Sequence, residues 1–280
     1  MVGEDLYNNY AFVCNNSEKL DRWTTKNVKN YFSFRKHLLS SMDFAEIETI
    51  TQGTLEIMNP ISEEKLLRAG KIAGLAPGKR VLDIGCGNGT ALSLWHRTFG
   101  IEGTGIELRP ASAAIARSTL AGTPIEIRCV DAAAIAPKEP YDVVAALGTS
   151  FIFGGAEKSL AHLADYADEN GSAVLIGDRF WQTNRVPPEF AREWTDVPTA
   201  YELAATAREL GFTLAGMITA SADDWDTYES SIWNNALAYI SARGNDPAAE
   251  EIAAYVEQIQ DEYLAYGREY MGWGLFVFRQ

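Results

Sequence analysis

The sequence predicts an α/β protein in which helices cover both faces of a parallel sheet. Short apolar runs alternate with stretches of helical periodicity from Ser62 to Gly177. The first run leads directly into a turn that contains three glycines, and a helical pattern follows that turn. Strands and helices that alternate at this spacing form βαβ units, and right-handed crossovers place the helices on both faces of the sheet.

The elements follow one another in a regular order. A helix begins at Ser62, a favoured N-cap residue that precedes the acidic Glu63 and Glu64, and it ends in the stretch Gly74 to Gly78. The predicted strands are Arg80 to Ile84, Glu102 to Ile106, Ile125 to Val130, Tyr141 to Leu147 and Ala173 to Ile176, and helices over Thr90 to Phe99, Pro110 to Leu120 and Ala156 to Ala167 separate them.

The C-terminal part of the sequence is less regular. A predicted helix over Ala200 to Leu210 precedes a strand over Phe212 to Ile218, and Leu275 to Phe278 is the last predicted strand. Between these strands, Ala222 to Tyr270 forms two long helical patterns that are broken near Gly244 to Pro247.

The composition is that of a globular protein with a large core. The chain has 280 residues, of which 47% are hydrophobic and 22% are charged, and a disordered chain would contain fewer apolar residues. With 24 Lys and Arg against 38 Asp and Glu, the formal charge is −14. A field of this sign repels phosphate backbones, so we expect no nucleic acid among the partners.

Neither the cysteines nor the hydrophobic pattern indicates a metal site, a membrane or export. Cys14, Cys86 and Cys129 are far apart and form no Cys-x-x-Cys pair. No apolar run reaches the roughly 18 residues that span a bilayer, and Met1 to Tyr10 is too polar and acidic for a signal sequence. We therefore expect a soluble cytoplasmic protein without a metal; its oligomeric state, monomer or homodimer, stays open.

Charge is distributed unevenly along the chain. Lys19 to Lys36 carries six basic residues and one acidic residue, whereas the region from Asp223 onward carries eleven acidic and three basic residues. The basic segment also contains four aromatic residues, so we expect helices that dock on the rest of the protein. We predict an N-terminal helical lid over residues 1–55 and a main domain over residues 56–280. A solvated basic helix face with a buried aromatic stripe is the alternative.

The most informative stretch is VLDIGCGNGT, residues 81–90. An apolar strand runs into Gly85, Gly87 and Gly89, and glycine is needed where the backbone turns sharply or a ligand approaches it closely. Asp83 precedes this turn by two residues. The spacing Gly-x-Gly-x-Gly differs from the Gly-x-Gly-x-x-Gly that receives a dinucleotide pyrophosphate, which argues against NAD or FAD as the ligand.

Acidic and small residues stand at the ends of the next strands. Glu107 ends the second strand about 20 residues beyond the glycine turn, where a carboxylate can accept hydrogen bonds from both hydroxyls of a ribose. Asp131 follows the third strand and can meet an adenine amino group, while Ala132 is small enough to lie beside the ring. Leu147 ends the fourth strand, beneath the expected position of the ligand's reactive end.

These strand ends, taken in order, resemble the class I S-adenosylmethionine-dependent methyltransferases. The resemblance implies a seven-stranded doubly wound sheet whose last pair of strands is antiparallel, and S-adenosylmethionine as the cofactor. It places Asp83 and Gly85 near the methionine part, Gly87 at the closest backbone approach, and the acids described above on ribose and adenine. The full set of cofactor residues that we expect is Asn59, Asp83, Gly85, Cys86, Gly87, Gly89, Glu107, Leu108, Asp131, Ala132 and Leu147.

A narrower resemblance covers about residues 56–280. It is similar to a bacterial and archaeal group within the menaquinone/ubiquinone C-methyltransferase-like set that has a C-terminal Gly-Trp-Gly motif. The motifs that carry it are MNPISEEK (58–65), GTGIE (103–107), LGTSFIFGG (147–155), LIGDRFW (175–181), DWDTYES (224–230) and GREYMGWGLF (267–276). In this group Asn59 matches the place where the N-terminal segment crosses the methionine end of the cofactor; an Asn turn before Pro60 is the alternative.

The acceptor of a class I enzyme lies over the carboxyl ends of strands four and five, in the crevice outside the sheet. Side chains that follow these two predicted strands are therefore candidates for contact with it. They are Thr149, Ser150 and Phe151 after the fourth strand, and Asp178, Arg179, Phe180 and Trp181 after the fifth.

A second group of candidates lies on one face of a predicted helix. Trp225, Tyr228, Glu229 and Trp233 have helical spacing. A buried aromatic stripe explains three of them, but a stripe does not need Glu229, and a carboxylate among aromatic rings can bind or deprotonate an amine or a hydroxyl. The predicted catalytic residues are Arg179, Trp181, Tyr228 and Glu229.

Three functions are compatible with these patterns. The leading hypothesis is an enzyme that transfers a methyl group from S-adenosylmethionine to a small-molecule acceptor by in-line displacement. The second is intramolecular cyclisation of the same cofactor to azetidine-2-carboxylate with release of methylthioadenosine. The third is a regulatory protein that binds the cofactor without turnover. Fold alone does not decide among them or identify the acceptor.

Overall fold

The computed structural model describes residues 42, 44–132, 135, 139–169, 171–244 and 246–280. The chain divides into two compact units, Met1–Phe44 and Ala45–Gln280. Most of the predicted lid, including its basic segment, lies outside the described residues. The second unit begins within helix α4 (Phe44–Gln52), which the sequence analysis assigned to the N-terminal segment.

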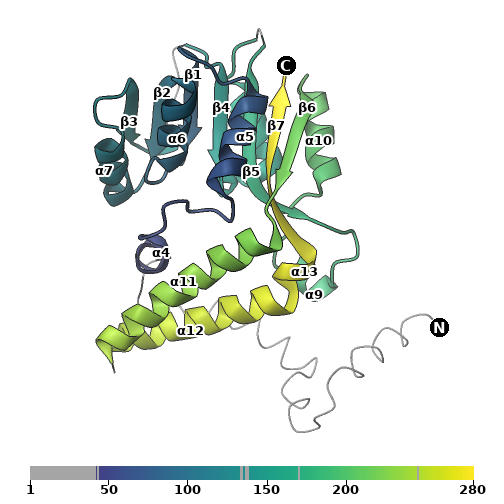
Figure 1. The fold of residues 1–280 in the computed structure, drawn as a ribbon. Coiled ribbons are helices and arrows are strands. Elements are labelled where there is room, and N and C mark those ends of the chain that lie inside the picture. Colours follow the sequence, from purple (N-terminus) through teal and green to yellow (C-terminus); the bar gives the residue numbers. More distant parts are fainter. Residues whose placement is uncertain (1–41, 43, 133–134, 136–138, 170, 245) are drawn as a thin grey trace, which may run out of the picture. The chain divides into compact units, whose positions relative to one another are not determined.

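A seven-stranded sheet forms the centre of the second unit, in the order β3-β2-β1-β4-β5-β7-β6 (Figure 1). Strands β1 to β5 are parallel, and β7 runs antiparallel between β5 and β6. This topology confirms the predicted α/β fold with an antiparallel last pair. The strands are β1 (Arg80–Ile84), β2 (Glu102–Glu107), β3 (Ile125–Cys129), β4 (Val143–Leu147), β5 (Ala173–Trp181), β6 (Thr213–Thr219) and β7 (Met271–Arg279).

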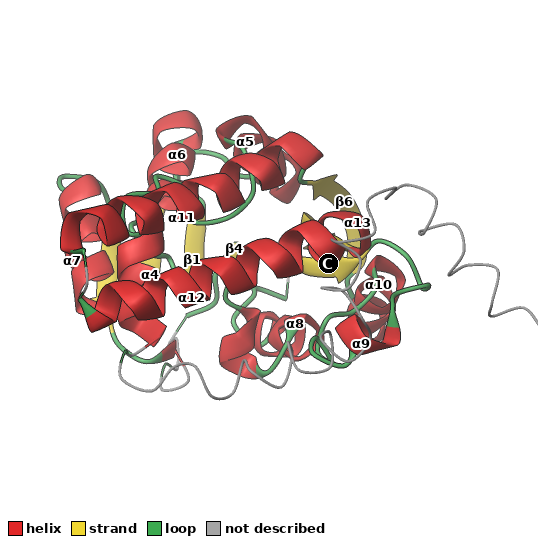
Figure 2. Cartoon of the chain, turned by 90° about the horizontal axis from the view of Figure 1, so that it is seen from below, coloured by secondary structure: helices red, strands yellow, loops and turns green. Residues whose placement is uncertain are grey.

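Helices cover both faces of this sheet (Figure 2). Buried side chains of α5, α6 and α7 join one core cluster with the sheet, and those of α8 and α10 join a second cluster on the opposite face. The helices with described residues are α4, α5 (Glu63–Ala73), α6 (Thr90–Phe99), α7 (Pro110–Thr119), α8 (Ala156–Ala164), α9 (Pro188–Ala191), α10 (Ala200–Glu209), α11 (Ala222–Arg243), α12 (Pro247–Glu262) and α13 (Arg268–Tyr270), with short turns η3 (Ser150–Phe153) and η4 (Tyr263–Gly267).

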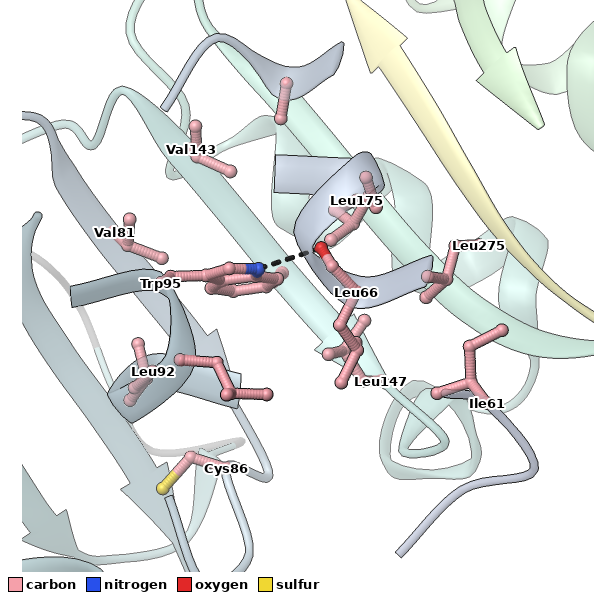
Figure 3. Close-up of a cluster of buried hydrophobic side chains, with 14 of the residues drawn as sticks. Ile61, Leu66, Val81, Cys86, Leu92, Trp95, Val143, Leu147, Leu175 and Leu275 are labelled. Carbon is pink, nitrogen blue, oxygen red and sulfur yellow. Dashed lines mark hydrogen bonds between the residues drawn. The ribbon is translucent and has the colours of Figure 1, made fainter. Parts of the chain in front are cut away.

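The core between α5, α6 and the sheet is closed by one large side chain. Trp95 of α6 is fully buried, and its indole Nε1 donates a hydrogen bond to the backbone oxygen of Leu66 in α5 at 3.0 Å (Figure 3). This bond satisfies the polar atom that an indole brings into a core. The contact therefore fixes α5 against α6, directly behind the glycine turn that follows β1.

Helices α11 and α12 form a long pair beyond the carboxyl ends of the parallel strands (Figure 1). Ser221 and Asp224 form a capping box at the start of α11, and Asp246 caps α12 ahead of Pro247. The chain reverses between them, as the break near Gly244 predicted. In the described part of the chain, no helix is long and apolar enough to cross a membrane.

Strand β5 extends further than the sequence analysis predicted. The prediction ended it at Ile176, because Gly177 and two charged residues interrupt the apolar run. In the structure β7 pairs with the whole of β5, with Asp178 opposite Gly274 and Trp181 opposite Met271. The acceptor candidates from Asp178 to Trp181 therefore lie within β5 rather than after it, which corrects their predicted position.

The Gly-Trp-Gly stretch of β7 is explained by packing on the two faces of the sheet. On one face, the ring of Phe180 lies where a Cβ at Gly272 would be, 2.6 Å away from that position. On the other face Trp273 is buried and covers Gly177, whose Cβ position lies 2.8 Å from the indole. Gly272 thus leaves room for the ring of Phe180, and the Cβ position of Gly274 lies 3.3 Å from the same ring.

Candidate active site

The glycine turn after β1 has a backbone that only glycine adopts without strain. Gly85, Gly87 and Gly89 have φ angles of 74°, 57° and 81°. The N–H of Gly85 donates to the backbone oxygen of Ile106 at 2.8 Å, which ties the turn to β2. A Cβ at Gly85 would also lie 2.3 Å from Thr149. Both the conformation and the space therefore require glycine at this position.

Gly87 presents an open backbone at the tip of the turn. A Cβ there would meet only the sulfur of Met58, at 3.4 Å, among the described atoms. Its N–H donates to Oε2 of Glu107 at 2.9 Å. The carboxylate at the end of β2 thus holds the glycine turn in place, and a ligand can approach the backbone beside it.

Glu107 is buried and accepts two further hydrogen bonds. Its Oε1 accepts from the backbone N–H of Arg109 at 2.8 Å and from the Nε of the same residue at 3.1 Å. The guanidinium of Arg109 also contacts Glu48 of α4 at 3.3 Å. Sequence analysis found the acid at the end of β2 but neither of these partners.

Asp83 of β1 is a buried carboxylate with an unused oxygen. It is 2% exposed, and its Oδ1 has no hydrogen-bond partner among the described residues. Burial, with a smaller effect from the nearby Glu107, raises the pKa of Asp83 to about 7. Buried polar atoms nearly always have a partner. An unsatisfied carboxylate beside an open backbone therefore indicates a site for a ligand that carries a donor or a positive charge.

The segment before α5 crosses the ends of β1 and β4. Asn88 and Thr90 each donate a hydrogen bond to the backbone oxygen of Glu56, at 3.0 and 2.6 Å. Asn59 donates from Nδ2 to the backbone oxygen of Leu147 at 3.2 Å. Asn59 therefore lies at the carboxyl end of β4, beside the glycine turn.

The other predicted cofactor residues lie at the same edge of the sheet, with different exposure. Cys86, Ala132 and Leu147 are buried. Leu108, by contrast, is 64% exposed, and Asp131 is exposed as well. These two follow β2 and β3 directly, so their side chains border the site rather than form its buried floor.

Glu229 of α11 is a second carboxylate that is partly buried. Burial raises its pKa to about 7, against the lowering effect of Arg179, and Glu262 adds to the rise. Within the described ranges, no hydrogen bond or ion pair holds this carboxylate. A group of this kind is available to a ligand.

Arg179 of β5 is a positive charge that lacks an ion pair in the described part of the chain. Its guanidinium lies 4.9 Å from the ring centre of Trp194. It stands opposite Trp273 in the register of β5 and β7, and Trp273 packs in the core cluster that includes Trp225 of α11. Arg179 is near enough to Glu229 to lower the pKa of that carboxyl, but the two side chains form no salt bridge among the described residues.

Tryptophans lie one helical turn before and one turn after Glu229 on α11. The rings of Trp225 and Trp233 lie 5.9 and 6.0 Å from that of Tyr263. The Nε1 atoms of both tryptophans are buried and have no hydrogen-bond partner among the described residues. Tyr228 is anchored instead, since its hydroxyl donates to Gln52 of α4 at 3.1 Å, and burial raises its pKa. Trp225 is buried, and Tyr228 and Trp233 pack partly buried against the same core cluster, so a packing role and a role at the acceptor both stay predictions for this stripe.

Two other acceptor candidates are bound to neighbouring side chains. Asp178 accepts hydrogen bonds from the hydroxyl of Ser150 and from the backbone N–H of Arg179, and burial raises its pKa. The indole of Trp181 packs edge-on against Phe190 at 5.6 Å. The structure therefore gives both side chains packing roles, and a catalytic role for Trp181 stays a prediction.

Sequence analysis missed the residues of α4. Glu48 and Gln52 are four residues apart, so they lie on the same face of the helix, and one contacts Arg109 while the other contacts Tyr228. The four-residue spacing indicates a shared helix face, but nothing in the neighbouring sequence indicates which elements that face contacts. Among the described residues, no group of three or more His, Cys, Asp or Glu side chains is arranged to hold a metal ion.

Comparison with known proteins defines the class of this fold and site. A family profile described as "Methyltransferase domain" matches residues 81–171. The chain is 33% identical to a SAM-dependent methyltransferase from Thiobacillus denitrificans, solved in complex with S-adenosyl-L-homocysteine, with a TM-score of 0.76 over 85% of this chain and 99% of the other. The protein belongs to the class I S-adenosylmethionine-dependent methyltransferase family.

Individual relatives differ in how much their names reveal. The uncharacterized protein YjhP of Escherichia coli (strain K12) is 32% identical over 84% of this chain and 98% of its own length. The Ubiquinone biosynthesis O-methyltransferase of Bordetella pertussis is 35% identical over 63% of this chain and 83% of its own length. The first relative matches over nearly its whole length but has no named activity, and the second has a named activity but matches a smaller share of this chain.

Proposed function

We propose that this protein transfers the methyl group of S-adenosylmethionine to a small-molecule acceptor. The observation that carries the proposal is the pair of buried acids at the ends of β1 and β2. Asp83 offers an unused oxygen, and Glu107 lies beside an open glycine backbone. S-adenosylmethionine has a ribose diol, a positively charged ammonium and a sulfonium, so its donors and charges fit these two acids.

The residues at this edge would hold the cofactor in parts. Glu107 takes the ribose hydroxyls, and Gly85, Gly87 and Gly89 allow close approach. Asp83 and Asn59, with Leu147 beneath them, face the methionine part. Leu108, Asp131 and Ala132 border the adenine, and Cys86 packs behind the turn. The bound cofactor supplies a methyl group on a positively charged sulfur, which makes sulfur a good leaving group.

Residues of β5 and α11 would serve the acceptor. Glu229 receives a proton from an acceptor hydroxyl or amine, because its pKa near 7 lets it act as a base at neutral pH. Arg179, which lacks an ion pair in the described region, stabilises the electron-rich acceptor atom that results. The bond from that atom to the methyl carbon forms as the carbon–sulfur bond breaks, and the surrounding indoles exclude water.

The named relatives support an oxygen acceptor. The Bordetella pertussis relative is an O-methyltransferase by name, and a hydroxyl acceptor becomes a good nucleophile when a base such as Glu229 removes its proton. The motif resemblance to the menaquinone/ubiquinone C-methyltransferase-like group, with its Gly-Trp-Gly motif, is part of the same proposal; in this chain the Gly-Trp-Gly stretch packs against Phe180 and Gly177.

Incubation with methyl-labelled S-adenosylmethionine and an extract of low-molecular-mass metabolites tests the proposal. We expect S-adenosylhomocysteine as the nucleoside product, with the label recovered in a small molecule by mass spectrometry. Release of methylthioadenosine from the cofactor alone would show cyclisation instead. Binding without any product would favour the regulatory hypothesis, and either result would overturn the proposal.

A further inference from the structure

Glu107 has too few free lone pairs for a ribose in the arrangement seen here. A carboxylate has two oxygens with about two acceptor positions each. Oε1 already accepts from the N–H and the Nε of Arg109, and Oε2 accepts from Gly87. A ribose that donates one hydroxyl to each oxygen therefore finds space on Oε2 but none on Oε1.

Of the two donors on Oε1, only one can leave easily. The backbone of Arg109 is the N-cap of α7, with φ −78° and ψ 119°, and it is held by the helix that follows. Its side-chain Nε makes the longer of the two bonds, 3.1 Å against 2.8 Å. Rotation of one side chain costs far less than unwinding a helix start. The guanidinium is thus the group that would yield to the ribose.

Glu48 is placed to receive the displaced guanidinium. Its Oε2 already contacts Nη1 of Arg109 at 3.3 Å, and both side chains are about one-quarter exposed. Burial raises the pKa of Glu48, and Arg109 lowers it, so a closer guanidinium would favour the ionised form. An arginine fork binds a carboxylate with two parallel bonds, and only one bond is made here. A stronger Arg109–Glu48 pair is therefore available.

Helix α4 extends this contact to α11. Gln52 of α4 accepts from the hydroxyl of Tyr228 at 3.1 Å, and the backbone oxygen of Thr51 accepts from Asn235 at 2.8 Å. Tyr228 is the residue directly before Glu229. Hydrogen bonds and one helix thus connect the carboxylate at the end of β2 with the helix that carries the proposed base.

We propose that Arg109 and Glu48 are positioning residues that couple the two halves of the site. When ribose hydroxyls bind to Glu107, the guanidinium of Arg109 moves to Glu48 and forms a stronger ion pair with it. This ion pair stabilises the position of α4, and the hydrogen bonds between α4 and α11 then stabilise α11. The inference rests on the proposed function, in which Glu107 binds the ribose. It predicts that cofactor binding orders the acceptor helix before any acceptor arrives.

The side-chain Nε–H signal of Arg109 reports this movement directly. It is assigned in ¹⁵N-arginine-labelled full-length protein by its loss in Arg109→Lys. We expect the signal to shift when S-adenosylhomocysteine is added, and to shift less in Glu48→Gln. A signal that stays unchanged while the ligand binds by calorimetry overturns the coupling but leaves the proposed function standing. Failure of the wild type to bind overturns both.

Hydrogen exchange of α4 and α11 provides the second readout, with a matched control. Glu46→Gln makes the same substitution on the same helix at an exposed side chain. In the wild type and in Glu46→Gln, S-adenosylhomocysteine should slow amide exchange in both helices. In Glu48→Gln, affinity should fall by about fivefold, the value of one partly exposed ion pair, and the slowing in α11 should be lost. Retained slowing in Glu48→Gln contradicts the proposal, whatever the thermal stability of the variant.

Discussion

The carboxyl edge of the sheet holds polar side chains in two different ways. At the ends of β1 and β2, Glu107 is bonded to backbone N–H groups and fixes the glycine turn before any ligand is present. Between β5 and α11, Arg179 and Glu229 lack a salt bridge in the described region, although both are partly buried. The preformed backbone of the glycine turn and of the α7 start suits a ligand that never changes, although the Arg109 side chain has to move to admit it, whereas side chains without partners suit a ligand that supplies them.

The two regions also differ in how their residues come together. The first is drawn from a single βαβ stretch, from Asp83 to Arg109. The second combines β5 with α11 and the turn at Tyr263, which are far apart in sequence. One consequence is that substitutions in the first region should affect cofactor binding, and those in the second should affect turnover.

The largest effect is expected from Glu229→Gln. Loss of a general base lowers the rate by roughly 10²- to 10⁴-fold, and methyl transfer from labelled cofactor measures it. The affinity for S-adenosylhomocysteine should not change, because the substitution lies in the second region. Glu250→Gln, at an exposed position of α12, is the control. A rate within a few-fold of that of the wild type would show that Glu229 is not the general base.

The pH dependence of the rate tests the same residue. The pKa of Glu229 is raised to about 7, so the ionised base becomes tenfold rarer for each pH unit below that value. At saturating cofactor, the rate should rise with pH and level off above about 7. The rising limb should be absent in the residual activity of Glu229→Gln. If the rising limb of the pH profile persists in Glu229→Gln, the limb reports the ionisation of another group.

The stability of the first region should depend on pH through Asp83. Its pKa rises from 3.8 unfolded to about 7 folded, so the native state retains a proton that the unfolded state loses. The contribution of Asp83 to the free energy of unfolding is fully present below pH 3.8. It decreases as pH rises from there to about 7, by at most about 1.4 kcal/mol per pH unit.

Asp83→Asn should remove this dependence. In urea unfolding, the free energy of unfolding of the variant should exceed that of the wild type by an amount that grows as pH rises from 3.8 to about 7. Asp223→Asn, at an exposed position of α11, should show no such trend. Parallel pH curves for Asp83→Asn and the wild type would mean that Asp83 is solvated.

The smallest effect is expected from Tyr228→Phe. Its hydroxyl donates to Gln52, so the substitution should cost about 1 kcal/mol of unfolding free energy and reduce the rate by only a few-fold. Tyr201→Phe, at a side chain that is 75% exposed, should leave the unfolding free energy unchanged. A loss of rate as large as that in Glu229→Gln would make Tyr228 a catalytic residue rather than an anchor.

Much of the first region could be predicted from the sequence, because its residues are adjacent and their spacing is local. The glycine turn, Asp83 and the acid at the end of β2 all follow from one strand–turn–helix pattern. The extension of β5 to Trp181 could not be predicted, since it depends on pairing with β7, far along the chain. The contact of Glu48 with Arg109 is also non-local, and no periodicity reports which helix packs on which strand end.

The most direct test of the division between the two regions is the affinity for S-adenosylhomocysteine in Glu107→Gln and Glu229→Gln, measured side by side by calorimetry. Glu102→Gln, an exposed acid on the same strand as Glu107, is the control. We predict a loss of about 100-fold in Glu107→Gln, where charge-assisted hydrogen bonds are removed, and wild-type affinity in the other two variants. Equal losses in Glu107→Gln and Glu229→Gln, or no loss in either, would contradict it.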